Sequence, residues 1–291
     1  MLGELMNVFV YPNLQKPNSR KYTEQVCEVL HNEKVDLLME DCCRGVFEKQ
    51  YDIEYMSLEQ CVEHCDMIVV TGGDGTILRC SSYASRYDKP ILGINCGTLG
   101  FMASLEPEHI ESLKNLCTGD YRIVERMMLN VKVRSANGKI TEADALNDVV
   151  LFKNDNCNIS DFEVSKSGSL VSSIRADGII FSTPTGSTAY SLSAGGPLVE
   201  PDLQCIEFSQ ICAHSLFARP IIFSPDSYIT VNCRCSDGGS AHLTVDGNRL
   251  LNVSAGDVIN ISRSKLTTKI IDMTDGSFFA TVNSKLMTPI K

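Results

Sequence analysis

An apolar, β-branched segment runs directly into three glycines and one aspartate, in the stretch IVVTGGDGTIL at residues 68–78. The first four residues predict a buried strand, and the turn that follows it needs only one or two glycines. Glycines at 72, 73 and 75 omit three Cβ atoms, so a bulky group can approach the backbone. At the carboxyl end of a parallel strand, such a loop presents N–H groups to a ligand. The stretch therefore favours a phosphate loop in an α/β unit over a plain tight turn.

Asp74 is the residue that a plain turn does not explain. An unpaired carboxylate repels phosphate unless it binds Mg²⁺ or accepts a proton during the reaction. The loop matches neither the GxxxxGK[ST] pattern of Walker A loops nor the GxGxxG dinucleotide fingerprint. Asp74 is therefore a candidate metal ligand or general base, held on a loop of Gly72, Gly73 and Gly75.

Predicted strands and helices alternate through the first 120 residues. The strands are predicted within 6–13, at 35–39, at 67–70 and at 90–95, and the helices at 19–31, 58–65 and 107–116. Ser19 is predicted to cap the first helix. This alternation is typical of a parallel, doubly wound sheet.

Short β-rich segments divided by turns follow a boundary predicted near residues 119–122. Such segments occupy 129–134, 148–152, 178–182, 221–223, 228–233 and 258–262, with turns at Asn137-Gly138 and Asp246-Gly247. Helical patterns almost disappear in this part of the sequence, so the second half is predicted to be all-β.

The composition bounds the partners and the compartment. A net charge of −10 argues against a nucleic-acid partner, and no apolar run approaches the roughly 18 residues of a membrane span. Thirteen cysteines without a signal-peptide pattern indicate reduced thiols in a cytoplasmic protein. Cys61 and Cys65 lie one helical turn apart, which allows a zinc site but fits half-buried helix cysteines better.

A second loop follows the strand predicted at 178–182 and reads TPTGSTAYSLSAGGP through residue 197. Its hydroxyls and free amides suit the edges of adenine and ribose, and Tyr190 can stack on a ring. The alternative is a plain Ser/Thr-rich connection, against which its length and its central tyrosine argue.

These blocks resemble the NAD kinases, in the superfamily of the diacylglycerol kinases and phosphofructokinases. The resemblance rests on GGDGT at 72–76, GINCGTLGF at 93–101 and the segment 177–197, with smaller agreements at 125–126, 145–148, 213–216 and 246–247. It implies an α+β two-domain fold with the active site between the domains. Residues 1–120, joined by 278–291, would form a Rossmann-like α/β domain, and residues 121–277 an all-β NAD-binding domain.

The resemblance also implies the reaction, which is transfer of the γ-phosphate of ATP to the 2′-hydroxyl of the adenosine ribose of NAD, giving NADP. Asp74 would accept the hydroxyl proton, and Mg²⁺ or another divalent cation on the triphosphate would offset the charge. No protein ligand is assigned to that metal. A homodimer or homotetramer is implied, in which a neighbouring subunit often completes the NAD pocket.

Further site residues follow from the resemblance alone. Gly72, Gly73 and Gly75 would hold the loop close to the phosphates. Arg79 would meet NAD phosphates or lie at the surface. Asn147 and Asp148 would contact adenine and ribose, and Arg175 and Asp177 would help to form the pocket shared between subunits. The adenine and nicotinamide-ribose region would be lined by Thr188, Ala189, Tyr190, Ser191, Leu192 and Ser193. His214 is either a ligand contact or a core histidine, and Asp246 is interpreted as a turn residue.

Two departures and three rival functions accompany this assignment. Asn158 stands where several relatives carry a histidine, and Cys96 in the second glycine turn is a small filler or an oxidation-sensitive thiol. Lipid kinases of the diacylglycerol or sphingosine type resemble GGDGTxNE, whereas Ile77-Leu78-Arg79 follows the loop here. A non-catalytic NADP(H)-binding protein gains nothing from Asp74, and the GxSxG elbow of a Ser/His/Asp hydrolase is missing. ATP and polyphosphate are alternative phosphate donors, and NAD and NADH are alternative acceptors. Feedback regulation by NADP(H) is a further alternative to be tested.

Overall fold

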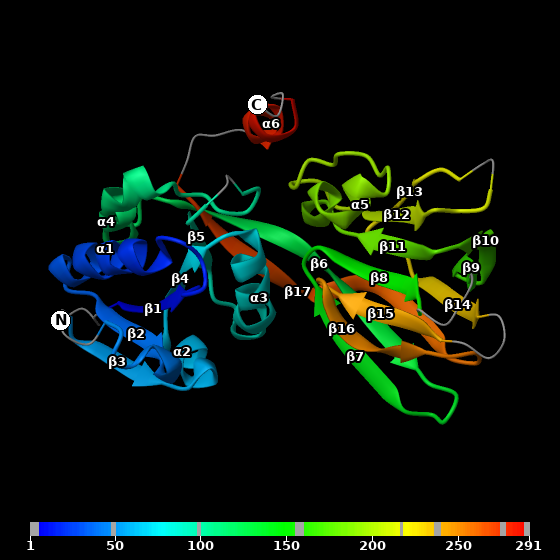
Figure 1. The fold of residues 1–291 in the computed structure, drawn as a ribbon, viewed down its shortest axis with the longest axis horizontal. Coiled ribbons are helices and arrows are strands. Elements are labelled where there is room, and N and C mark those ends of the chain that lie inside the picture. Colours follow the sequence, from blue (N-terminus) through cyan, green and yellow to red (C-terminus); the bar gives the residue numbers. More distant parts are fainter. Residues whose placement is uncertain are drawn as a thin grey trace. The chain divides into compact units, whose positions relative to one another are not determined.

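A computed structural model describes residues 6–47, 51–97, 100–154, 160–215, 218–235, 240–273 and 278–287. The chain divides into two compact units, Met1–Glu125 with Thr268–Lys291 and Arg126–Thr267 (Figure 1). The first is an α/β unit and the second an antiparallel β unit, which confirms the predicted fold class. In the described part of the chain, no helix is long and apolar enough to span a membrane.

The first unit is a parallel sheet with helices on both faces. Its strands are β1 (Asn7–Pro12), β2 (Asp36–Glu40), β3 (Ile53–Met56), β4 (Met67–Gly72) and β5 (Ile91–Asn95), in the order β5-β4-β1-β2-β3. The end of β17 (Val258–Asp272) joins β5 in parallel through Ile270 and Ile91. The helices are α1 (Ser19–Asn32), α2 (Leu58–His64), α3 (Asp74–Ala84), α4 (Lys114–Thr118) and α6 (Phe278–Val282), with a π-helical turn at Asn283–Met287 and 3₁₀ turns at Asp41–Cys43, Ser85–Tyr87 and Pro107–Leu113.

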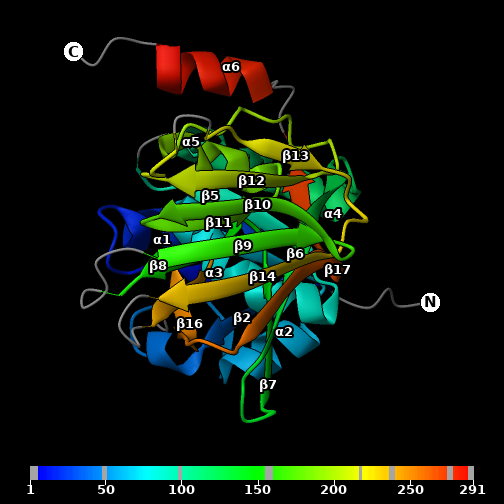
Figure 2. The ribbon, with the colours of Figure 1, turned by 90° about the vertical axis from the view of Figure 1, so that its right-hand side faces the viewer.

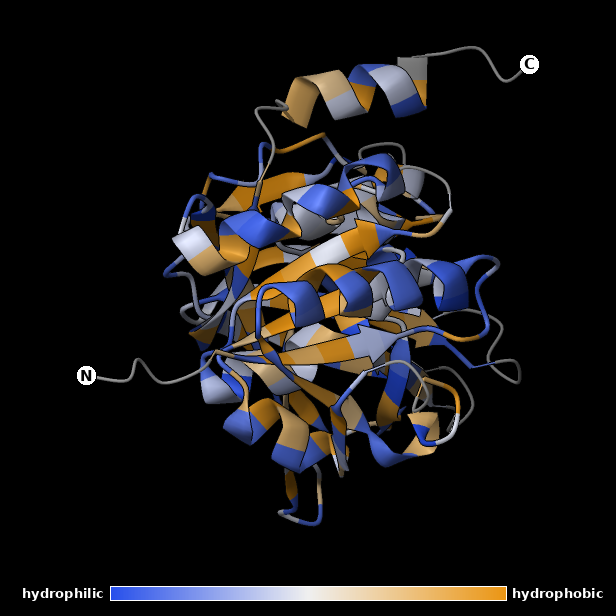
Figure 3. Cartoon of the chain, turned by 90° about the vertical axis from the view of Figure 1, so that its left-hand side faces the viewer, coloured by the Kyte–Doolittle hydropathy of each residue, from blue (hydrophilic) through white to orange (hydrophobic). Residues whose placement is uncertain are grey.

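The apolar run in β4 explains why both faces of this sheet are covered. Successive side chains of a strand point to opposite faces. Met67 and Val69 therefore pack in one cluster with residues of α1, whereas Ile68 and Val70 pack in another with residues of α2 and α3. Figure 3 shows the hydrophobic strands behind helices whose outer residues are hydrophilic. A strand that is apolar on both sides is stable only between two layers of helices.

The helix boundaries differ from the prediction at two places. Ser19 is the first residue of α1 and not its cap, because Asn18 takes that position with φ 62° and Ser19 Oγ donates to the carbonyl of Thr71 at 3.2 Å. The segment predicted as one helix at 107–116 is a 3₁₀ helix followed by α4, since His109 has non-helical angles. The predicted helix at 58–65 begins with a capping box between Ser57 and Gln60.

The second unit contains two antiparallel sheets that share one core (Figure 2). Its strands are most of β6 (Arg122–Arg134), β7 (Ile140–Ala145), β8 (Asp148–Lys153), β9 (Ser160–Lys166), β10 (Ser169–Ala176), β11 (Gly178–Ser182), β12 (Ile206–Ile211), β13 (Ile221–Phe223), β14 (Ile229–Cys235), β15 (Ala241–Val245), β16 (Asn248–Val253) and most of β17. One sheet has the order β10-β9-β14-β17, with β6 and β7 attached, and the other β13-β12-β11-β8-β15-β16. The loop after β11 forms a 3₁₀ turn at Thr185–Thr188 and the short helix α5 (Tyr190–Ser193).

Candidate active site

The glycine loop joins β4 to α3, with Gly73 as the residue before the helix. A Cβ at Gly72 would lie 2.5 Å from the hydroxyl of Thr76, so the local packing requires this glycine. A Cβ at Gly73 or Gly75 would meet no atom within 4 Å. These two glycines therefore leave open space over the backbone, as expected where a ligand approaches the N–H groups.

Asp74 is the first residue of α3, and its carboxylate has a fixed orientation. Its Oδ2 accepts the N–H of Phe101 at 2.7 Å, and its Oδ1 accepts the N–H of Met102 at 3.1 Å. A Cβ at Gly100 would overlap Oδ1, so a glycine at this position lets the second loop close over the carboxylate. Each oxygen keeps a lone pair beyond the one that it uses, so Asp74 remains able to accept a proton.

A pocket of about 220 Å³ lies over this loop. Its lining residues are Asn13, Lys16, Gly72, Gly73, Asp74, Gly75, Thr76, Asn95, Gly97, Gly100 and Lys285. Two lysines and one aspartate give the lining a positive formal charge, which suits a phosphate chain. Lys285 comes from the C-terminal segment, and its Nζ lies 4.3 Å from the ring centroid of Phe101. Arg79 is exposed on α3 and does not line this pocket.

The two lysines were missed by the reasoning from sequence. Lys16 follows β1, whose carboxyl end lies beside that of β4, so the strand order could have pointed to it. Lys285 lies far along the chain in a segment with no motif, and nothing in the sequence alone links it to the glycine loop. Only the tertiary structure brings Lys285 to Phe101 and so to the glycine loop.

The cysteines singled out in the sequence are buried. Burial raises the pKa of the Cys96 thiol to about 11, so it is protonated at neutral pH and acts as a small filler. Burial likewise raises the pKa of Cys61 to about 12 and that of Cys65 to about 11. Among the described residues, no group of three or more potential ligands could hold a metal ion. Asn158 lies outside the described residues.

In the second unit, Asp246 holds the segment that contains Asn147 and Asp148. It occupies the turn between β15 and β16 with φ 49°, as its assignment to a turn predicts. Its carboxylate also accepts three backbone N–H groups, from Leu146 at 2.8 Å, Asn147 at 2.8 Å and Asp148 at 3.1 Å. This second role escaped the reasoning from sequence, because a turn motif does not indicate what its side chain binds.

Asp148 and Asp246 carry neighbouring carboxylates, and of these two only that of Asp246 accepts backbone N–H groups from the described residues. Burial, and then the nearby Asp246, raise the pKa of Asp148 to about 7. Burial also raises the pKa of Asp246, but its three N–H bonds oppose that effect. The three N–H bonds therefore favour the charged form of Asp246, and Asp148, with a pKa of about 7, is the group that binds a proton near neutral pH. Next to them, Asn147 Oδ1 is buried and accepts no hydrogen bond from the described residues.

The hydroxyl-rich loop packs directly on this segment. A Cβ at Gly186 would overlap the carbonyl of Asn147, so the two predicted parts of the nucleoside site do meet in this unit. Within the loop, Tyr190 is 41% exposed and Ser193 is also exposed, while Thr188, Ala189 and Leu192 are half-buried. Ser191 differs from these five predicted site residues, because its side chain is fully buried and donates a hydrogen bond to Glu207.

Three further predicted residues lie at the surface of the second unit. Arg175 forms a bidentate ion pair with Asp161, at 2.8 and 2.9 Å. Asp177 pairs with Lys153 at 2.6 Å. His214 donates its backbone N–H to the carbonyl of Arg175, and its side chain is exposed, so the alternative of a core histidine is wrong.

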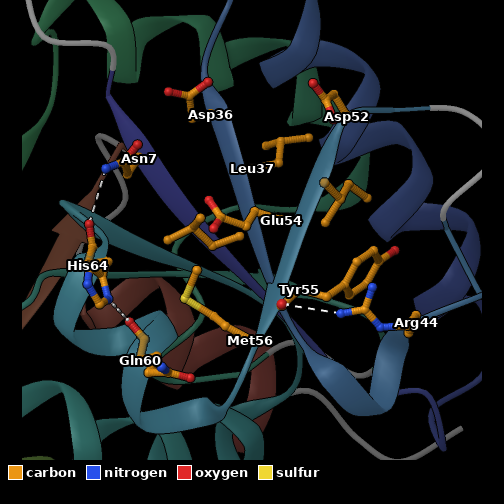
Figure 4. A pocket seen from close by; sticks show the side chains of 12 residues that line it. Asn7, Asp36, Leu37, Arg44, Asp52, Glu54, Tyr55, Met56, Gln60 and His64 are labelled. Carbon is orange, nitrogen blue, oxygen red and sulfur yellow. Dashed lines mark hydrogen bonds between the residues drawn. The ribbon is translucent and has the colours of Figure 1, made fainter.

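A larger hollow of about 890 Å³ lies at the edge of the first unit, beside β2, β3 and α2 (Figure 4). It contains Asp36, Asp52 and Glu54, while Arg44 points to the carbonyl of Tyr55 at 3.3 Å. No predicted site residue lines it. Three carboxylates and no glycine loop make it a poor phosphate site, so the pocket over Asp74 is the candidate.

Asp148 gives a testable pH dependence of stability. The pKa of about 7 for Asp148 in the folded state lies above the ordinary aspartate value. At pH values between these two pKa values, the folded state therefore binds the proton and the unfolded state does not. The free energy of unfolding therefore falls as pH rises from about 4 to 8, by about 2–4 kcal/mol if Asp148 acts alone. Urea unfolding at pH 5 and pH 8 should show this fall in the wild type and a smaller fall in Asp148→Asn. Equal falls would contradict the assignment.

A glycine-lined pocket with a fixed carboxylate, together with a hydroxyl-rich loop on a β unit, is the arrangement expected of a nucleotide-dependent phosphotransferase. Comparison with known families makes this specific. The ATP-NAD kinase N-terminal domain matches residues 8–121, and the ATP-NAD kinase C-terminal domain matches residues 146–273. The chain belongs to the NAD kinase family, and it is an ATP-dependent kinase of NAD.

Relatives of known name agree over most of the chain. The NAD kinase of Natranaerobius thermophilus is 34% identical over 97% of this chain and 98% of its own length. The NAD kinase of Trichlorobacter lovleyi is 37% identical over 84% of this chain and 82% of its own length. These matches favour the NAD kinase assignment over a lipid kinase or a non-catalytic NADP(H)-binding protein.

Two solved structures are similar throughout. Yeast NADH kinase complexed with NADH has a TM-score of 0.89 and 25% identity, covering 100% of this chain and 90% of that one. An NAD kinase from Archaeoglobus fulgidus in complex with ATP has a TM-score of 0.73 and 26% identity, covering 97% of this chain and 99% of that one. The two-domain fold is therefore the fold of this family.

Proposed function

We propose that Asp74 is the general base of this NAD kinase. It would accept the proton of the 2′-hydroxyl of the adenosine ribose as the γ-phosphate of ATP is transferred, giving NADP. The observation that carries the proposal is the pair of N–H bonds from Phe101 and Met102, which aim the carboxylate in a pocket lined by glycines. Fixed orientation and proton acceptance are the two properties that such a base requires.

The pocket over the glycine loop is proposed to bind the phosphates, with Gly73 and Gly75 leaving room for them and Lys16 and Lys285 supplying charge. A divalent cation on the triphosphate would neutralise part of its charge during transfer. Asp74 is the only carboxylate among the described residues that line the pocket, so the cation would be held mainly by the phosphates. Arg79 is proposed to contact the NAD phosphates, and its exposure on α3 is compatible with that role.

The adenosine part of NAD is proposed to bind to the second unit. Asn147 Oδ1 is a buried acceptor without a partner among the described residues, and the adenine amino group is a donor that would satisfy it. Asp148 would hold a ribose hydroxyl, and the exposed ring of Tyr190 would stack on a base. The backbone and side chains of Thr188, Ala189, Leu192 and Ser193 would complete this part of the site, with Ser191 contributing through its backbone.

We further propose that the chain works in the cytoplasm as a homodimer or homotetramer, in which Arg175 and Asp177 help to form a pocket shared between subunits. Both residues lie at the surface of the second unit, where a neighbouring copy could reach them. Light scattering coupled to gel filtration would determine the oligomeric state. The variant Arg175→Ala should then raise the KM for NAD, and a monomer with unchanged KM would contradict the shared pocket.

One assay tests the function and the choice of substrates. The purified protein is incubated with Mg²⁺, with ATP or polyphosphate as donor and with NAD or NADH as acceptor. Product is measured with an NADP-specific dehydrogenase. ATP with NAD should give NADP. The other combinations measure the specificity of the enzyme for its phosphate donor and for its acceptor. Failure to form product with any donor, acceptor or divalent metal would contradict the proposed function.

Lys285 gives a prediction about the phosphate pocket. Replacing Lys285 with alanine removes one of two cations from the lining and should raise the KM for ATP about tenfold, the effect of one partly exposed charge-assisted contact. The KM for NAD should change less than about twofold. Lys139→Ala, which alters an exposed lysine in the β6–β7 turn, is the control. An unchanged KM for ATP, or equal increases for both substrates, would contradict the role of Lys285.

A further inference from the structure

Glu207 is a buried acid that the proposed mechanism does not use. It lies on β12 and its side chain is fully buried. Burial raises its pKa, and hydrogen bonds from Ser191 and Ser209 oppose this only in part. Burying a carboxyl destabilises the folded state unless hydrogen bonds compensate for the lost hydration. The hydrogen-bond partners of Glu207 therefore indicate its role.

The contacts of Glu207 are with the hydroxyl-rich loop and with Ser209, which lies on the same strand β12. Oε1 accepts a short hydrogen bond from Ser191 Oγ and another from Ser209 Oγ at 3.0 Å. The two serine hydroxyls are 2.9 Å apart, so the three side chains form a closed triangle. A Cβ at Gly196 would overlap Oε1, which means that the loop also closes on Glu207 from its far end.

The second carboxyl oxygen of Glu207, Oε2, differs from Oε1 in its surroundings. Oε2 is buried and has no hydrogen-bond partner among the described residues. A buried ionised carboxylate with a bare oxygen is strongly destabilised, whereas the neutral acid is destabilised much less. Burial and the bare Oε2 both disfavour the charged form of Glu207, and Oε1 is the acceptor of both serine hydroxyls. A glutamine has the same shape and the same acceptor oxygen.

We propose that Glu207 is the positioning residue of the NAD site, which fixes α5 through Ser191 and so sets the place of the Tyr190 ring. This inference rests on the proposed function, because it takes α5 as part of the NAD site. Ser191 is buried and Tyr190, its neighbour in α5, is 41% exposed. Successive helical residues point in different directions, so holding Ser191 inward keeps Tyr190 outward. The side-chain bond from Ser191 ties this single short turn to β12, whereas the backbone bonds of α5 stay within its own loop.

The test compares Glu207→Leu with Glu207→Gln. Leucine removes the acceptor and should raise the KM for NAD about tenfold while the KM for ATP stays within about twofold. Glutamine keeps the acceptor and should restore the KM for NAD to within about twofold of the wild type. Gln210→Leu, on the opposite face of the same strand, is the matched control and should leave both KM values unchanged. Equal increases of both KM values, or a Glu207→Gln variant as impaired as Glu207→Leu, would overturn the proposal.

A second variant keeps the test sharp if Glu207→Leu fails to fold. Ser191→Ala removes the donor of the same bond and should raise the KM for NAD in the same direction. Where Glu207→Leu folds, the effects in the double variant Ser191→Ala/Glu207→Leu should be non-additive, because both changes act on one contact. Additive effects, or a Ser191→Ala variant with a wild-type KM for NAD, would overturn the proposal.

Direct binding separates this inference from the proposed function. Calorimetric titration with NAD, without ATP, should show weaker binding to Glu207→Leu than to the wild type, whether or not NADP is formed. A wild type that binds NAD and makes no NADP would contradict the proposed function. The NAD affinities of the wild type and Glu207→Leu could still be compared in that case. Equal NAD affinity for the wild type and Glu207→Leu would overturn the role of Glu207 even in an active enzyme.

Discussion

Asp74→Asn is expected to lower kcat for NADP formation by about two to four orders of magnitude, the range for a lost general base. Asparagine has nearly the same size, and its oxygen can still accept one of the two N–H bonds from Phe101 and Met102. Its amide cannot accept the proton of a ribose hydroxyl. The geometry of the loop is largely retained, so the loss should fall on the chemical step and not on binding.

Three measurements separate this chemical effect from misfolding. NAD and ATP affinities of Asp74→Asn, measured by calorimetric titration, should stay within about threefold of the wild type, and its unfolding temperature should change little. Asp66→Asn is the matched control, because Asp66 also accepts a backbone N–H, from Asn7 at 2.8 Å, and does not line the pocket. It should keep its kcat. Full activity of Asp74→Asn would show that another group accepts the proton, even though the family assignment stands.

The fold class could be predicted because the strands of the first unit carry their own signal. In β4, every residue from Met67 to Val70 is apolar, and only a strand covered on both faces has this pattern. β3 was not predicted, since Ile53–Met56 at the edge of the sheet includes the exposed Glu54. β17 extends from Val258 to Asp272, although only its first residues were expected. Its second half, with Arg263, Lys265 and Lys269, reads as polar because one side of it faces solvent.

The candidate site could be predicted only where its chemistry follows local sequence. The glycine loop and Asp74 form one continuous stretch with an unusual composition. Asp246, Glu207 and Lys285 act on partners elsewhere in the chain, and their neighbours in the sequence carry no sign of this. Asp246 reads as an ordinary turn residue, yet its carboxylate is bonded about a hundred residues away. Such residues are recognised only when tertiary structure identifies the atoms that they contact.

Asp246→Ala is expected to raise the KM for NAD about a hundredfold. The change leaves three backbone donors, at Leu146, Asn147 and Asp148, without their acceptor. Each buried donor without a partner costs about 1–3 kcal/mol, so the segment should move until water or another acceptor reaches it. Because Asn147 and Asp148 are the proposed adenosine contacts, this movement should weaken NAD binding. The KM for ATP should change far less.

Asp257→Ala is the matched control for Asp246→Ala. Asp257 is also a buried aspartate of the second unit, and its carboxylate accepts the N–H groups of Ala136 at 2.8 Å and Ser254 at 2.9 Å. Both variants should lower the unfolding temperature, since both leave buried donors without an acceptor. Only Asp246→Ala should lose affinity for NAD, because only Asp246 supports the proposed nucleoside segment. If the two variants lose NAD affinity equally, the loss reflects general destabilisation, and Asp246 is then a structural turn residue.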